Sequence, residues 1–125
     1  MIYLDTHVAA WLYAGKIELI PKFVLVEMEH NDLKISPVVA LELQYLFEIG
    51  RVTKPGIDVI QYLTKNLELS ICDIPFEDVI KNSLKQNWTS DPFDRIITAQ
   101  AAINFSVLVT KDPIIQKNYK KVLWK

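Results

Sequence analysis

The stretch DPFDRIITAQAAINFSVLVT, residues 91–110, decides the fold class. Asp91-Pro92 is a helix-start signal, because aspartate caps the first turn and proline fits there without losing a hydrogen bond. A strongly apolar helix is predicted from this signal to about Ile103, and Ser106–Thr110 is typical of a strand. A helix followed directly by a strand is the repeating pattern of α/β domains with a parallel sheet.

The same alternation between strand-like runs and helical spacing continues through the rest of the chain. Three further strands are predicted at Ile2–Leu4, Leu33–Ile35 and Leu67–Ile74. Helices are predicted around Val8–Gly15, over Pro21–His30, from Ser36-Pro37 to about Ile49, after Pro55, after Pro75 and from Asp112-Pro113. The pattern therefore predicts an α/β fold whose central sheet is mainly parallel and flanked by helices.

Length and composition narrow the class of protein. The chain has 125 residues, 50% of them hydrophobic and 23% charged, which predicts one folded domain over residues 1–125 and excludes disorder. A single cysteine, Cys72, excludes a disulfide scaffold and fits a reducing cytoplasm. We expect no leader and no membrane span. The mean hydropathy of +0.15 is high for a small domain and indicates that a partner covers apolar surface.

Three aspartates lie at predicted element junctions. Asp5 ends the first strand, Asp112 follows the last predicted strand, and Asp94 lies in the first turn of the helix that Asp91 begins. Because the carboxyl ends of parallel strands share one edge of a sheet, these side chains are expected to converge. Each of them could instead be an ordinary helix cap, which is a common use of aspartate.

Glu42 needs a different explanation. It lies in the interior of a predicted helix, beside apolar neighbours at three and four residues, where it cannot cap the helix. Several carboxylates crowded together repel each other unless a cation neutralises them. Mg²⁺ is the natural cation for oxygen ligands and Mn²⁺ could replace it, whereas only two histidines are available to a metal that prefers nitrogen.

Four motifs, in order along the whole chain, resemble those of PIN-domain ribonucleases and, more narrowly, VapC-type toxins of bacterial toxin-antitoxin pairs. They are Asp5-Thr6-His7, Ser36-Pro37 with Glu42, Asp91-Pro92-Phe93-Asp94-Arg95 followed by Ala99-Gln100-Ala101, and Thr110-Lys111-Asp112. The resemblance implies a three-layer PIN-like domain. It also implies a cytoplasmic endoribonuclease toxin with a cognate antitoxin protein as partner, usually a homodimer.

The resemblance also implies roles for individual residues. The acids that would hold one or two Mg²⁺ ions are Asp5, Glu42, Asp94 and Asp112. The hydroxyl groups that would support them belong to Thr6, Ser36 and Thr110. The implied reaction is hydrolysis of an RNA phosphodiester by a metal-activated water, without a side-chain nucleophile. For Asp91 we favour a capping role over metal contact, and for His7 a supporting or packing role.

Basic residues near these motifs are candidates for contact with RNA. Arg95 and Lys111 adjoin proposed ligands and could bind a substrate phosphate, although Arg95 could instead pair with a carboxylate. The tail from Gln116 to Lys125 contains four lysines and no acid, interleaved with Tyr119 and Trp124. We interpret this tail as a solvated helix followed by an edge strand, and the sequence leaves open whether it also binds RNA.

Two other readings remain open. A receiver-type phosphoacceptor domain has a similar length, a parallel sheet, an aspartate after the first strand and a lysine after a late one. It should also have an acidic pair after the first strand, whereas Asp5 stands alone. A catalytically inactive PIN-like domain that only binds protein or RNA would keep the fold. All four acids are present, which disfavours this reading.

Overall fold

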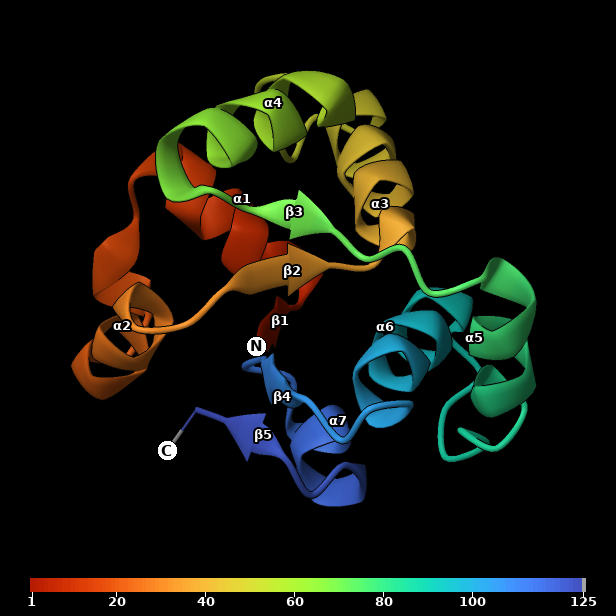
Figure 1. Cartoon of the computed structure of the whole chain (residues 1–125). Helices are drawn as coiled ribbons and strands as arrows, with labels where there is room; N and C mark the ends of the chain where they lie inside the picture. The colour runs from red at the N-terminus through yellow and green to blue at the C-terminus, as the bar shows by residue number, and fades with distance from the viewer. Residues whose placement is uncertain (125) are drawn as a thin grey trace.

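A five-stranded sheet in which all strands are parallel forms the centre of the molecule (Figure 1). The computed structural model describes residues 1–124, so Lys125 of the predicted basic tail lies outside the described residues. The strands are β1 (Ile2–Leu4), β2 (Leu33–Ile35), β3 (Ser70–Ile71), β4 (Val107–Val109) and β5 (Val122–Leu123). Their order across the sheet is β3-β2-β1-β4-β5.

Helices flank the sheet and give a three-layer α/β fold, as predicted (Figure 1). Within residues 1–124 they are α1 (Thr6–Ala14), α2 (Lys22–Glu29), α3 (Pro37–Glu48), α4 (Gly56–Leu67), α5 (Phe76–Ser83), α6 (Pro92–Ala102) and α7 (Pro113–Asn118), with a short 3₁₀ turn η1 (Ile17–Leu19). Every residue of the central strand β1 is buried, as expected for a parallel strand covered on both faces. None of these helices has the length and apolar composition of a membrane span.

The predicted helix starts coincide with observed caps. Ser36 Oγ accepts a hydrogen bond from the amide of Val38, and Asp91 Oδ1 accepts from the amide of Phe93. The first helix ends, as predicted, at Gly15, whose φ of 74° lies in the left-handed region that glycine tolerates. Short-range capping chemistry therefore places the starts of α3 and α6 correctly.

The predicted strand over Leu67–Ile74 is wrong in its extent. Helix α4 continues through Leu67, and only Ser70 and Ile71 pair with β2. Cys72 follows the strand and is buried as a small core residue, with its Sγ accepting a 2.9 Å hydrogen bond from the Tyr3 hydroxyl. The apolar run combined the end of a helix with a very short strand, and periodicity alone cannot separate the two.

Helix α3, which carries Glu42, is held against α4 by an unusually close approach. Gly56 begins α4, and its amide donates a 3.0 Å hydrogen bond to Gln44 Oε1. A Cβ at position 56 would lie 2.6 Å from the backbone oxygen of Ala40. Only glycine permits this contact, so Gly56 sets the distance between the two helices.

The strand order separates this fold from one of the alternatives. In receiver-type domains the order is 2-1-3-4-5, whereas here β1 lies between β2 and β4. The receiver-type reading is therefore wrong. The direction of winding reverses between β1 and β4, and the crevice beyond the carboxyl ends of two such strands is where α/β sheets bind ligands.

Candidate functional site

Asp5 and the segment 110–112 lie at this reversal point. Asp5 directly follows β1 and caps α1, while Thr110 and Asp112 follow β4. The amide of Asp5 donates a 3.0 Å hydrogen bond to the carbonyl of Val109, which ties the two strand ends together. Residues that are far apart in the sequence thus meet at one edge of the sheet, as predicted.

Thr110 joins the two aspartates of this edge. Its hydroxyl donates a 2.5 Å hydrogen bond to Asp5 Oδ2 and accepts a 3.0 Å hydrogen bond from the amide of Asp112. The other Asp5 oxygen accepts from the amide of Thr6 at 2.8 Å. Both Asp5 and Thr110 are buried, so neighbouring polar groups hold the Asp5 carboxylate in a fixed orientation.

Glu42 reaches the same edge from α3. Its Oε1 accepts a 2.5 Å hydrogen bond from the Thr6 hydroxyl. The carboxyl is half-buried, and desolvation raises its pKa. The Thr6 hydrogen bond lowers this pKa, whereas the negative charges of Asp5 and Asp91 raise it further. Glu42 therefore turns towards the other acids, which accounts for a carboxylate in the interior of a helix.

Asp94 has the most perturbed surroundings of the four acids. It lies in the first turn of α6, while Asp91 supplies the cap and leaves the Asp94 carboxylate without a hydrogen bond among residues 1–124. All contributions together raise the pKa of Asp94 to about 7, and burial is the largest of them. Further upward contributions come from the charges of Asp91, Asp5, Asp112 and Glu42. The four predicted acids thus share one electrostatic neighbourhood.

Asp112 combines this position with a second task. Its Oδ1 accepts hydrogen bonds from the amides of Ile114 at 2.8 Å and Ile115 at 3.2 Å, so Asp112 caps α7. The capping and site readings of this residue are compatible, because the other carboxylate oxygen is not used by the cap.

His7 bridges the two strand ends, which the sequence suggested only as a general supporting role. Its Nε2 accepts a 3.0 Å hydrogen bond from the amide of Lys111, and its Nδ1 lies 3.5 Å from Asp5 Oδ2. Its ring packs edge-on against Trp11 at 5.0 Å, and Lys111 Nζ lies 5.7 Å from the centre of the same indole. The sequence offered one signal for this contact, which is that His7 follows Asp5 by only two residues.

The remaining predicted residues are placed as follows. Ser36 is buried and caps α3. Arg95 Nε donates a 2.7 Å hydrogen bond to the carbonyl of Thr89, so it anchors the loop before α6 and forms no ion pair among residues 1–124. Lys111 is exposed beside the acids. Sequence reasoning missed Gln116, whose side-chain amide donates a 3.1 Å hydrogen bond to the carbonyl of Thr110.

The donor set fits a hard divalent cation in its chemistry. All four acids offer carboxylate oxygens, which are the ligands Mg²⁺ prefers, and their mutual repulsion favours a neutralising cation. Their spacing is wider than a closed site requires. Within residues 1–124 no group of three or more histidine, cysteine, aspartate or glutamate side chains is close enough to hold a metal ion. The ligand roles of these acids stay predictions.

Comparison with known proteins identifies the family to which this geometry corresponds. The family model described as PIN domain matches residues 2–121. No curated protein matches the chain at a significant level.

Three solved structures share the fold along nearly the whole chain. One chain of the crystal structure of VapBC2 from Rickettsia felis bound to a DNA fragment from their promoter matches with TM-score 0.61 and 18% identity, covering 100% of both chains. A toxin-antitoxin complex from Klebsiella pneumoniae gives 0.63 and 18%, covering 98% of this chain and 96% of the other. DNA-bound VapBC from Salmonella typhimurium gives 0.65 and 18%, covering 97% and 93%.

Proposed function

The chain belongs to the PIN domain family, and on that premise we propose that it is a Mg²⁺-dependent endoribonuclease acting as the toxin of a toxin-antitoxin pair. The observation that carries the proposal is the convergence of Asp5, Glu42, Asp94 and Asp112 at the reversal point of the sheet. Their charges are close enough for the other three to raise the pKa of Asp94. Such a cluster is costly for a fold unless it serves a ligand.

The residues have separate tasks in this proposal. Asp5, Glu42, Asp94 and Asp112 would hold the cation, which Mn²⁺ could replace. A bound Mg²⁺ would supply an activated water for attack on phosphorus and would neutralise charge on the phosphate. Thr6 and Thr110 orient the carboxylates of Glu42 and Asp5 through their hydroxyl groups. Exposed Lys111 would bind a phosphate of the RNA, and buried Ser36 supports the start of α3.

The partners in this proposal are an RNA substrate, an antitoxin protein and a second copy of the chain. The solved structures that share the fold include toxin-antitoxin complexes, which supports an antitoxin partner. Large apolar side chains on α3 and near α5 are exposed, including Leu41 at 61%, Phe76 at 64% and Leu84 at 67%. Their burial against another chain would be favourable. We propose that the chain acts as one domain in the cytoplasm.

RNA cleavage by the purified chain tests the proposal. With Mg²⁺ present, we expect the unmodified chain to cut RNA internally, and Asp5→Asn and Asp94→Asn to lower the rate on the order of 100-fold, since each removes negative charge from the site. Asp32→Asn, at an exposed aspartate just before β2, is the matched control and should leave the rate unchanged. Full activity of both site variants would refute the site.

A further inference from the structure

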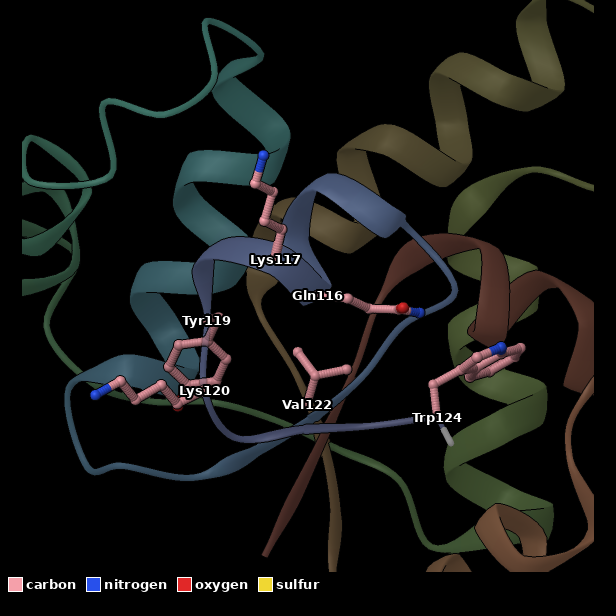
Figure 2. A pocket seen from close by; sticks show the side chains of 6 residues that line it. All are labelled: Gln116, Lys117, Tyr119, Lys120, Val122 and Trp124. Carbon is pink, nitrogen blue, oxygen red and sulfur yellow. The ribbon is translucent and has the colours of Figure 1, made fainter.

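A groove outside the acidic site lies between α7 and β5 (Figure 2). It is lined by Gln116, Lys117, Tyr119, Lys120, Val122 and Trp124. Lys117 and Lys120 are exposed, and neither forms an ion pair with an acid among residues 1–124. From residue 103 to residue 124 the chain contains four lysines and only one acid, Asp112. The groove is therefore cationic and free to bind an anion.

Hydrogen bonds connect this groove to the acidic site. Gln116, at the start of the groove, donates from its side-chain amide to the carbonyl of Thr110 at 3.1 Å. The hydroxyl of the same threonine donates to Asp5 Oδ2. Gln116, which lines the groove, is thus hydrogen-bonded to Thr110, and Thr110 orients the candidate metal ligand Asp5.

Aromatic contacts form a second connection. The rings of Trp124 and Trp11 lie 6.1 Å apart, and Trp11 packs against His7. A second hollow, lined by His7, Trp11, Lys111, Asp112 and Pro113, lies at this junction. Both hollows adjoin α7, so lysines and aromatic rings extend from the acids to β5.

Tyr119 gives the groove a fixed aromatic surface. Its hydroxyl donates a 2.6 Å hydrogen bond to the carbonyl of Ser106, and burial raises its pKa. Figure 2 shows the Tyr119 ring beside Lys120, with Lys117 extending from α7 in another direction. One lysine beside a preoriented aromatic ring and a second lysine on the adjoining helix suit a single strand, since phosphates bind the cations and bases stack on the ring.

We infer that this groove binds the single-stranded RNA that flanks the cleavage site and guides it to the acids. The inference rests on the proposed nuclease function for the identity of the polymer, and on the hydrogen bonds and ring contacts between the groove and the acidic site for its direction. An acidic protein segment would match the lysines equally well. Such a segment would not need the Tyr119 ring for base stacking, and it would have no reason to lie beside the proposed phosphodiester-cleaving site. Single-stranded RNA is therefore the better occupant.

Binding can be measured apart from cleavage. The probe is a fluorescein-labelled oligouridylate of about 12 nucleotides. Its Kd for the full chain is measured by fluorescence anisotropy in the absence of divalent metal. We expect Lys117→Gln/Lys120→Gln to raise Kd about 10-fold and to reduce the slope of log K against log salt by about 1.4, since about two phosphate contacts are lost. Lys117→Arg/Lys120→Arg should retain binding, because the charges remain.

The control is Lys54→Gln/Lys65→Gln, which removes two exposed charges just before and within α4, on the other side of the sheet (Figure 1). Equal Kd values for the two double variants would overturn the inference. Equally tight binding of an oligoglutamate that is lost in the groove variant would overturn it too, because the occupant would then be an acidic protein. If the unmodified chain binds the probe through the groove and cuts no RNA, only the nuclease proposal fails.

Discussion

Asp94 carries the largest electrostatic penalty among the site residues. Burial and four neighbouring carboxylates raise its pKa from an ordinary 3.8 to about 7. A raised pKa in the folded state means that the folded protein binds this proton more tightly than the unfolded chain does. The associated stability is present below pH 4 and is lost as the pH rises through 7.

Asp94→Asn should therefore stabilise the metal-free protein at high pH. The shift corresponds to about 4 kcal/mol at full strength, and solvent screening of a half-buried group reduces the expected gain to about 2 kcal/mol at pH 8. Near pH 4 the gain should vanish, because Asp94 is then protonated. Urea unfolding at both pH values measures this difference. An equal effect of Asn at pH 4 and pH 8 would contradict the assigned cause.

Two fully buried threonines offer a matched pair of substitutions. Thr110 uses its hydroxyl for Asp5 and for the amide of Asp112, whereas Thr98 Oγ1 has no hydrogen-bond partner among residues 1–124. Thr110→Val should lower the free energy of unfolding by about 1–3 kcal/mol and RNA cleavage by about 10–100-fold.

Thr98→Val is the control for this pair. It removes a buried hydroxyl that makes no hydrogen bond, so it should leave the stability unchanged or raise it. Calorimetry and RNA cleavage assays of both variants measure these effects. A loss of the same size for the two valines would show that shape, and not hydrogen bonding, determines the cost.

At the scale of elements, short-range signals were more predictive than long apolar runs. Ser36 and Asp91 identified helix starts because capping involves only the next few residues. The apolar run Leu67–Ile74 predicted too long a strand, because the length of β3 depends on pairing with β2, which is distant in the sequence.

In the candidate site, too, the sequence predicted some features and not others. Residue types and strand ends indicated which acids would meet, because all parallel strands finish at one edge. The hydrogen bond between Thr6 and Glu42, 36 residues apart, depends on how α1 packs against α3. The bridge from Gln116 to Thr110 likewise depends on where α7 settles against β4. Neither contact leaves a local sequence signal.

The contact between α3 and α4 gives a prediction for this scale. Gly56→Ala should destabilise the protein by about 1–3 kcal/mol, because the new methyl group would meet the backbone oxygen of Ala40, which cannot rotate away. Thr64→Ala, exposed on the same helix, should change the free energy of unfolding by less than about 0.5 kcal/mol. Urea unfolding of both variants measures the contrast. A Gly56→Ala protein as stable as the control would contradict the prediction, because α3 and α4 could then move apart at no cost in free energy.

For the whole molecule, the concentration of negative charge at one edge predicts a response to divalent metal. Mg²⁺ or Mn²⁺ should raise the melting temperature by several degrees, since a ligand about 100-fold above its Kd adds about 2.7 kcal/mol. The combined variant Asp94→Asn/Asp112→Asn should lose most of this gain. Thermal unfolding with and without metal is the measurement. An unmodified chain that shows no gain would favour the inactive PIN-like reading over the nuclease.

The two outermost strands, β3 and β5, contain only two residues each. Strands this short offer few unpaired amides and carbonyls, so a foreign strand would find little to pair with at either side. Recognition by strand addition is therefore a poor route for any protein that approaches this chain. A protein partner has to bind through contacts with side chains, and the short outer strands protect the sheet from joining others edge to edge into fibres.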